Sequence, residues 1–151
     1  MTDAQSSLFT DDEINRQARG NASVLPYLII AFAKANGHSP EDAAAFTGEA
    51  FATGWEELRG QGAHAIARMM ALNMASGGGK VRSVTGNDEH AEVRVTDYPT
   101  EEDAAFFGLS RAEAERFYFA FGPIAAYLGF QSEWRREDEE IVLTVDQERH
   151  A

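Results

Sequence analysis

The sequence predicts an α+β fold, in which a helical N-terminal half packs on a small antiparallel sheet built from the C-terminal half. Two observations carry this prediction. Alternating apolar and polar residues mark two hairpins, at 81–98 and 130–145. An aromatic-rich helical segment, 110–128, lies between them, so the C-terminal half follows the order ββαββ. Apolar residues before the glycine run 77–79 show helical spacing instead.

Three of the expected helices begin with the same chemistry. In Thr10–Glu13, Ser39–Asp42 and Ser110–Glu113, a hydroxyl occupies the N-cap and a carboxylate follows three residues later. The hydroxyl accepts a hydrogen bond from the backbone N–H of that third residue, and the carboxylate accepts one from the N-cap N–H. Helices are therefore expected to start at these three hydroxyl residues.

The first half is expected to contain four helices. The first is predicted over 11–19 and ends at Gly20, and the second covers 23–35. A third helix precedes the glycine-containing break at 59–63, and a fourth covers 63–75. The core-facing stripe of the second helix is predicted from its i, i+3, i+4, i+7 spacing to be Leu25, Leu28, Ile29 and Phe32.

The second half combines strands with helices. A short helix is predicted over 100–107, and the long helix over 110–128 is expected to bend at Gly122-Pro123. The strands alternate in polarity, so each should bury one face. The residues expected on the buried faces are Ala91, Val93, Val95, Ile141, Leu143 and Val145.

The chain is expected to form one domain over 1–151, with a helical part (10–76), a ββαββ part (79–146) and a tail (147–151). The absence of cysteine excludes disulfides and thiolate metal sites. No apolar run approaches the ~20 residues of a membrane-spanning helix. The first ten residues lack the pattern of a signal peptide. These features favour a cytoplasmic protein.

The charge balance is acidic and uneven. The chain carries 25 acidic and 13 basic residues, a net charge of −12. Residues 81–151 hold sixteen of the acids and seven of the bases, a net of −9. This charge repels phosphate backbones and anionic lipid surfaces, so we expect neither nucleic acid nor a membrane as partner. A small-molecule ligand and a second copy of the chain remain as partners.

The segment Leu109–Gly129 and the hairpin after it carry a family resemblance. A helical half followed by hairpin, helix and hairpin resembles the fold of 4-vinyl reductase domains and haem nitric-oxide-binding domains. It also resembles the L-2-amino-thiazoline-4-carboxylic acid hydrolases. The resemblance covers about residues 20–146 in element order and implies a pocket for a small molecule or cofactor. Where those families tend to carry cysteines, this chain has Phe117 and Val142.

His64 and Arg68 are the candidate catalytic residues. They lie four positions apart on one predicted helix face, where a histidine can act as a general base near neutral pH. His64 is also the histidine best placed for an axial ligand, should the haem resemblance apply. The alternative is a structural role for His64, as a capping or packing residue at the start of a helix. Glu49 and Glu56 would join His64 in a metal site only if one helix ran through 49–64.

Aromatic residues indicate where a ligand would lie. Tyrosines and tryptophans combine an apolar body with a polar handle, the usual lining of a small-ligand pocket. Simple filling of the core between helix and sheet is the alternative. The candidate ligand-binding residues are Tyr27, Trp55, Tyr118, Tyr127 and Trp134.

The function expected from these features is binding or sensing of a small molecule in an apolar, aromatic-lined pocket. One alternative is a cofactor-free hydrolase or lyase that resembles the thiazoline hydrolases and uses His64, Arg68 and a tyrosine. Another is a structural homodimer whose aromatic residues form the interface. No nucleophile elbow, phosphate loop or dinucleotide fingerprint is present. The sequence therefore identifies no cofactor and leaves open whether the protein is an enzyme.

Overall fold

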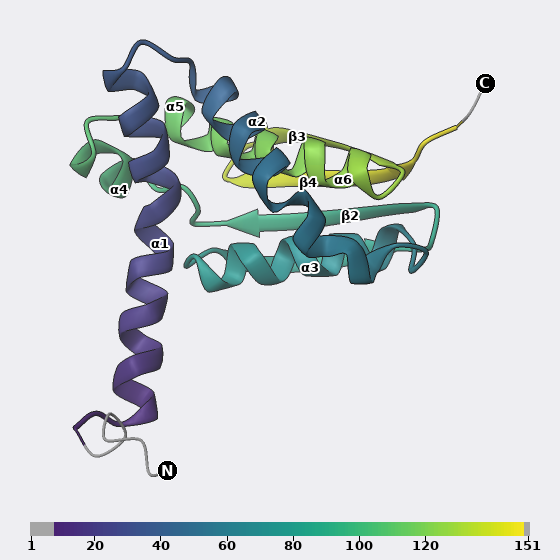
Figure 1. Cartoon of the computed structure of the whole chain (residues 1–151), viewed down its shortest axis with the longest axis horizontal. Coiled ribbons are helices and arrows are strands. Elements are labelled where there is room, and N and C mark those ends of the chain that lie inside the picture. The colour runs from purple at the N-terminus through teal and green to yellow at the C-terminus, as the bar shows by residue number, and fades with distance from the viewer. Residues whose placement is uncertain (1–7, 150–151) are drawn as a thin grey trace.

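A computed structural model describes residues 8–149 and confirms the α+β architecture (Figure 1). The four strands form one antiparallel sheet in the order β1-β2-β4-β3. They are β1 (Lys80–Gly86), β2 (His90–Thr96), β3 (Phe130–Glu137) and β4 (Glu140–Gln147). The predicted positions of both hairpins are confirmed. Met1–Ser7 of the N-terminal segment, and His150 and Ala151 of the predicted tail, lie outside the described residues.

Helices α3 and α6 and the 3₁₀ helix η2 contact the sheet. The helical elements are α1 (Asp11–Ala35), α2 (Pro40–Phe51), η1 (Ala52–Leu58), α3 (Ala63–Ser76), α4 (Glu101–Phe106), α5 (Arg111–Glu115), η2 (Arg116–Ala120) and α6 (Phe121–Tyr127). Among the described residues, no helix is both long and apolar enough to cross a membrane.

The core lies between the sheet and the helices that pack on it. In the register of β2 and β4, Val93 pairs with Leu143 and Val95 with Ile141. Paired residues point to the same face of a sheet, and all four side chains are almost completely buried. The predicted alternation is confirmed. β4 runs on to Gln147, which pairs with Phe130, so the prediction of a tail from residue 147 is wrong at that residue.

The hydroxyl caps form as predicted. Thr10 and Ser110 each accept a hydrogen bond from the N–H of a glutamate three residues on, and each glutamate caps in return. Ser39 accepts the N–H of Asp42 in the same way. These contacts involve only neighbouring residues, which explains why the sequence could indicate them.

Helix α1 is continuous, so the predicted end at Gly20 is wrong. The backbone stays helical through Gly20, whose carbonyl oxygen accepts a hydrogen bond of 2.8 Å from the Ser23 hydroxyl. A side-chain bond of 3.0 Å from Gln17 to Asn21 spans the glycine as well. Gly lowers helix propensity by about 1 kcal/mol, which the flanking residues can offset.

The inward face of α1 also differs from the prediction. Tyr27, Ile30 and Ala33 are buried, whereas the predicted core residues Leu25, Leu28 and Phe32 are 53%, 51% and 69% exposed. Helical spacing shows which residues share a face, but not which face meets the rest of the protein. Here the contacts of Tyr27 with residues 98–107 decide it.

The predicted long helix over 110–128 is divided, but not where the sequence indicated. Its middle turn tightens into η2, between α5 and α6. The division lies at 116–120, directly before the predicted bend at Gly122-Pro123, and Pro123 lies in the first turn of α6, where its missing N–H leaves no helical hydrogen bond unmade. The consequence for the site is that η2 turns Tyr118 inward while Phe119 stays partly exposed.

Candidate functional site

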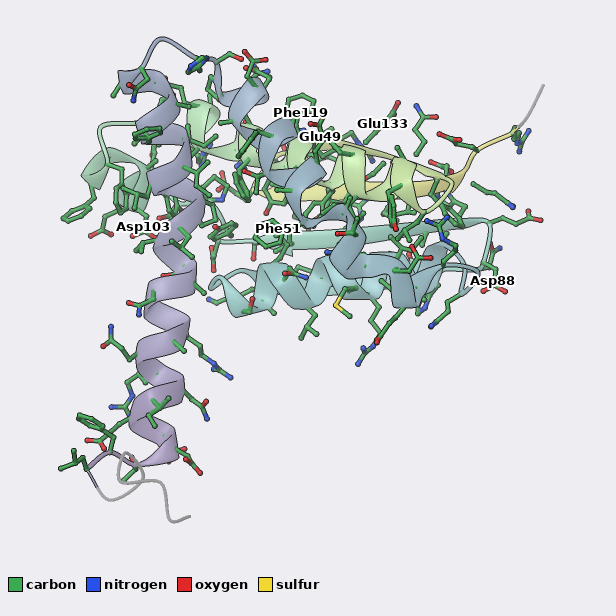
Figure 2. The ribbon with its side chains drawn as sticks, viewed as in Figure 1. Glu49, Phe51, Asp88, Asp103, Phe119 and Glu133 are labelled. Carbon is green, nitrogen blue, oxygen red and sulfur yellow. The ribbon has the colours of Figure 1, made fainter. Side chains whose placement is uncertain are left out.

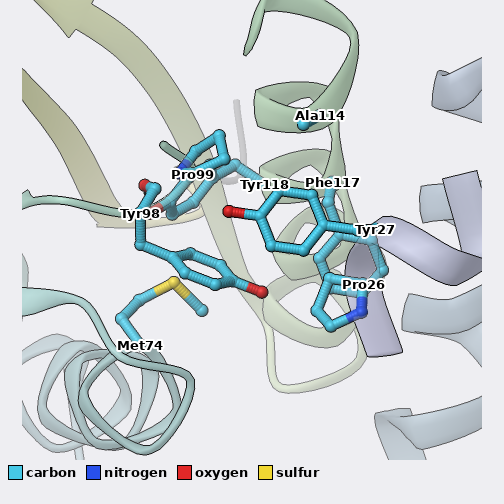
Figure 3. A pocket seen from close by; sticks show the side chains of 8 residues that line it. All are labelled: Pro26, Tyr27, Met74, Tyr98, Pro99, Ala114, Phe117 and Tyr118. Atoms are coloured by element: carbon cyan, nitrogen blue, oxygen red, sulfur yellow. Dashed lines mark hydrogen bonds between the residues drawn. The ribbon is translucent and has the colours of Figure 1, made fainter. Parts of the chain in front are cut away.

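Three tyrosines from separate elements meet between the helical half and the sheet (Figure 3). Tyr27 comes from α1, Tyr98 follows β2 and Tyr118 comes from η2. The Tyr118 hydroxyl donates to the Tyr98 carbonyl oxygen at 2.7 Å, and the Tyr27 hydroxyl accepts the N–H of Thr100 at 3.1 Å. The Tyr27 and Tyr98 rings meet edge to face, 5.8 Å apart. We call these three residues the tyrosine junction.

The tyrosine junction is closely packed. The cavity left among its rings, Met74 and Phe117 measures about 10 Å³, which is room for about one water molecule. Burial raises the pKa of Tyr27, of Tyr98 and, most strongly, of Tyr118. The three hydroxyl groups therefore stay protonated at neutral pH. The hydrogen bonds of the Tyr27 and Tyr118 hydroxyl groups join α1 and η2 to the segment that follows β2.

A larger space opens on the other side of Tyr118. The Tyr118 ring lies 5.8 Å from Trp134, and Phe119 meets Trp134 edge to face at 5.2 Å. Phe119 and Glu133, labelled in Figure 2, come from η2 and β3. Beside these rings is a hollow of about 300 Å³ at the edge strand of the sheet. This edge hollow is lined by Tyr118, Phe119, Gly122, Ser132, Glu133 and Trp134.

Trp134 carries an unsatisfied hydrogen-bond donor. Its Nε1 is buried, and no acceptor for it is found among residues 8–149. Pairing with Leu143 in the sheet register turns the ring toward η2 and α6 rather than toward the open face. A buried donor without a partner costs about 1–3 kcal/mol. The nitrogen is closed off from solvent, so an acceptor on a bound molecule would reach it only if the side chains that cover it moved.

Trp55 and Tyr127, also predicted to bind ligand, lie outside the lining of the edge hollow. Trp55 packs edge to face on Phe121, 6.2 Å away. Tyr127 lies under the Arg59 guanidinium, which is 4.8 Å from its ring centre and donates to its carbonyl oxygen at 2.9 Å. Of the five predicted aromatic residues, Tyr118 and Trp134 line the hollow and Tyr27 lies in the adjoining tyrosine junction.

His64 and Arg68 lie on α3, away from these aromatic residues. His64 is in the first turn, where its backbone N–H donates to the Asn87 carbonyl oxygen at 3.1 Å. Met74, which contacts the tyrosine junction, is ten residues further on, about 15 Å along the helix axis. The structure does not gather a histidine, an arginine and a tyrosine at one site here, and their catalytic role stays a prediction.

The metal alternative required one helix through residues 49–64. Glu49 instead lies on α2, Glu56 on η1 and His64 on α3. Glu56 forms an ion pair with Arg59 at 2.8 Å, which lowers the pKa of Glu56 to about 2. Within residues 8–149, no three histidine or carboxylate side chains are grouped closely enough to hold a metal ion.

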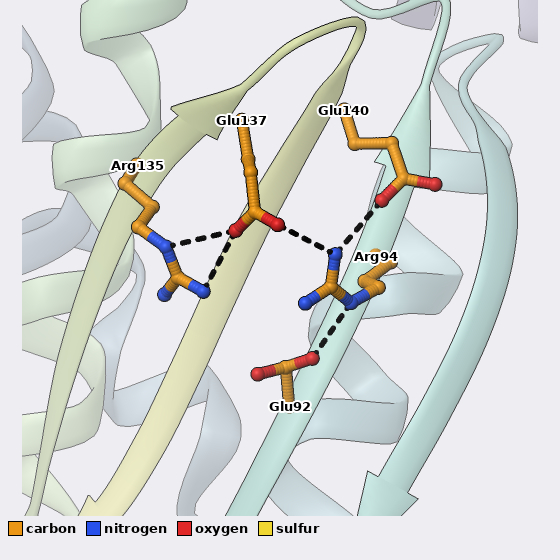
Figure 4. A network of polar contacts seen from close by, with 5 residues as sticks. All are labelled: Glu92, Arg94, Arg135, Glu137 and Glu140. Atoms are coloured by element: carbon orange, nitrogen blue, oxygen red, sulfur yellow. Dashed lines mark hydrogen bonds and ion pairs between the residues drawn. The ribbon is translucent and has the colours of Figure 1, made fainter.

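The open face of the sheet carries charges rather than a pocket (Figure 4). Arg94 donates to Glu92 at 2.8 Å and to Glu140 at 3.0 Å, and Arg135 donates to Glu137 at 3.0 Å. In the register, Arg94 and Arg135 flank Val142, which is fully buried, so we infer that their aliphatic stems cover it. Exposed pairs of this kind contribute little to stability, because water and salt screen their charges.

A second hollow, of about 160 Å³, lies where β2 ends and α4 begins. Arg111 and Arg136 line it together with three carboxylates, Asp97, Glu101 and Glu139. Arg136 is already paired with Glu115 at 2.7 Å. Its mixed charges make this hollow a weaker candidate for an apolar ligand than the edge hollow.

Sequence reasoning missed four residues of the edge hollow: Phe119, Gly122, Ser132 and Glu133. Only Gly122 carried a usable signal, since a glycine beside aromatic residues leaves space that a side chain would fill. A scan of the sequence against family models finds no match, and neither does a comparison with curated proteins.

Proposed function

We propose that this protein binds a small, largely apolar molecule in the edge hollow. The observation that carries the proposal is the buried indole N–H of Trp134, which has no acceptor and belongs to a ring lining a space of about 300 Å³. Natural pockets for small molecules have volumes of about 300–1,000 Å³ and combine aromatic walls with a few polar groups. The hollow is at the small end of that range.

The lining indicates the chemistry of the ligand. Tyr118, Phe119 and Trp134 offer ring faces, and Ser132 offers a hydroxyl. The Glu133 carboxylate and the net charge of −12 disfavour an anion. A neutral, flat molecule with one hydrogen-bond acceptor meets these conditions, and the acceptor would satisfy the Trp134 donor once the side chains that cover it shift.

Filling the hollow should abolish binding. Gly122 has helical backbone geometry, and a Cβ built on it meets no atom within 4 Å. We expect Gly122→Leu to fold normally and to weaken binding at least about tenfold, because its side chain occupies space that a ligand needs. The measurement is a fluorescence titration with prodan, a neutral naphthalene dye that carries a carbonyl acceptor.

Two controls separate the hollow from other apolar surface. Gly122→Ala makes the same gain in helix propensity but adds only a methyl group, so it should keep most of the affinity. Leu28→Gln removes an exposed leucine on α1 and should leave the titration unchanged. Equal prodan affinity in wild type and Gly122→Leu would contradict the proposal.

A further inference from the structure

Helix α1 presents a regular apolar seam to solvent. Its positions follow one another at intervals of four and three residues, the heptad spacing of helices that pair with other helices. The α1 seam consists of Ile14, Ala18, Asn21, Leu25, Leu28 and Phe32, and all six side chains are exposed. Tyr27, Ile30 and Ala33 occupy the opposite face, which packs on the rest of the protein. The seam therefore belongs to a face that the fold itself does not use.

The N-terminal part of α1 packs on nothing in the described chain. Every residue from 11 to 20 is exposed, and this arm projects away from the other elements (Figures 1 and 2). Helical segments shorter than about 12 residues are marginal in water without a packing partner. Gly20 and Pro26 lower the helix propensity of α1 further. An arm of this kind needs a surface to lie on.

We propose that α1 pairs in antiparallel orientation with α1 of a second copy, forming a homodimer. The twofold axis lies beside Ser23, the centre of α1. In this arrangement, the arm of each copy covers the apolar half of the other copy's α1, where Leu25, Leu28 and Phe32 are exposed. The same contact forms twice, once on each side of the twofold axis. It therefore supports the arms of both copies and covers the apolar half of α1 in both. None of the seam residues lines the edge hollow, so the dimer does not depend on the proposed ligand.

The register follows from the symmetry. A twofold axis at residue 23 places residue 14 opposite 32, residue 18 opposite 28 and residue 21 opposite 25. The large Phe32 then meets Ile14, and Leu28 meets the small Ala18. Every facing pair joins two seam positions, which is the condition for continuous interdigitation of side chains.

Charge favours the antiparallel orientation. The first turn of α1 carries Asp11, Asp12 and Glu13, and its last turn carries Lys34. Parallel pairing would bring six carboxylates together at one end, whereas antiparallel pairing places the two acidic turns at opposite ends of the helix pair. Antiparallel helix dipoles also set the positive end of each helix beside the negative end of the other.

The area is enough for a moderate dimer. Ile14 is 42% exposed, and the three large residues of the apolar half are more so. With Ala18 and Asn21, which are also exposed, the six seam side chains present on the order of 500 Å² on each copy, so pairing would bury about 1,000 Å², near the lower limit of specific interfaces. We therefore expect dissociation in the micromolar range rather than a permanent dimer.

Sedimentation equilibrium of the full chain tests the dimer, at concentrations from about 1 to about 200 µM. Leu28→Glu should raise the dissociation constant at least about 100-fold, because each dimer would have to desolvate two unpaired carboxylates. Leu72→Glu is the matched control, since Leu72 on α3 is 54% exposed against 51% for Leu28. The control should dimerise as wild type does.

Cross-linking tests the orientation and does not depend on the charged variant. The chain has no cysteine, so Ile14→Cys and Phe32→Cys each introduce a single thiol. After mixing and oxidation with oxidised glutathione, the antiparallel pair should yield mainly the disulfide between the two different variants, identified by intact mass. Each variant oxidised alone should stay largely uncross-linked.

Three results would overturn the proposal. The first is a wild-type chain that stays monomeric at the highest concentration. The second is an equal dissociation constant for Leu28→Glu and Leu72→Glu. The third is a predominance of the like-to-like disulfides, which a parallel pair would form. Unchanged prodan binding in Gly122→Leu, the result that would contradict the proposed function, would affect none of these readings, so the two proposals fail separately.

Discussion

Replacing Gly48 by alanine is expected to lower the free energy of unfolding by about 3 kcal/mol, because it inserts a methyl group where two helices touch. Gly48 is buried in α2, and a Cβ built on it would overlap the carbonyl oxygen of Ala120 at the end of η2. The atoms that the new methyl group would meet are backbone atoms of Ala120, so no side-chain rotamer change can relieve the overlap. The two helices would have to separate, and η2 carries both Tyr118 and Phe119.

Urea unfolding followed by circular dichroism measures this loss. Gly20→Ala is the matched control, since Gly20 is also helical and a Cβ there meets nothing within 4 Å. That variant should gain helix propensity and lose no stability. Gly48→Ala should also weaken prodan binding, because the edge hollow depends on the position of η2. A Gly48→Ala protein as stable as wild type would show that α2 and η2 do not approach as closely as described.

Stability is expected to fall steeply above about pH 10, by up to about 4 kcal/mol per pH unit. Burial raises the pKa values of Tyr27, Tyr98 and Tyr118 above the ordinary value of about 10. Below that pH, the three tyrosines are protonated in both the folded and the unfolded chain, so their contribution to the free energy of unfolding is fully present. Above it, the unfolded chain loses three protons that the folded chain retains, so rising pH favours unfolding. Each retained proton contributes about 1.4 kcal/mol per pH unit.

Urea titrations at a series of alkaline pH values measure this slope. In a Tyr127→Phe background, which leaves only the three junction tyrosines, tyrosinate absorbance should appear together with unfolding rather than before it. Tyr98→Phe removes one of the three hydroxyl groups, so its slope should be smaller by about a third. A slope in Tyr98→Phe equal to that of wild type would mean that Tyr98 ionises in the folded protein. In the Tyr127→Phe background, tyrosinate absorbance ahead of unfolding would contradict the closed packing of the tyrosine junction.

Much of the fold follows from local patterns. The alternation in 91–95 and 141–145 predicts two strands and their buried faces correctly, because a strand presents successive residues to opposite sides. Hydroxyl and carboxylate pairs locate three helix starts for a similar reason, since a cap involves residues three positions apart.

The candidate site was predicted only in part. Tyr118 and Trp134 attract attention as amphipathic aromatics, and both line the edge hollow. Phe119 is adjacent to Tyr118 in the sequence, and no sequence pattern identified it as a site residue. In the 3₁₀ turn η2, the Tyr118 ring is buried and the Phe119 ring is partly exposed. η2 also packs on α2, a contact between distant segments that the sequence of η2 does not indicate.

The sequence by itself determined the two hairpins, the buried faces of their strands and the hydroxyl caps of three helices. These properties depend on residues close together in the chain. Only the tertiary structure decided that Tyr27 rather than Leu28 faces inward and that the Trp134 donor is left without an acceptor. A helix with apolar residues on two faces can bury either one, and the choice is made by the partner surface that fits better. A hollow likewise exists only between elements, so no single segment encodes it.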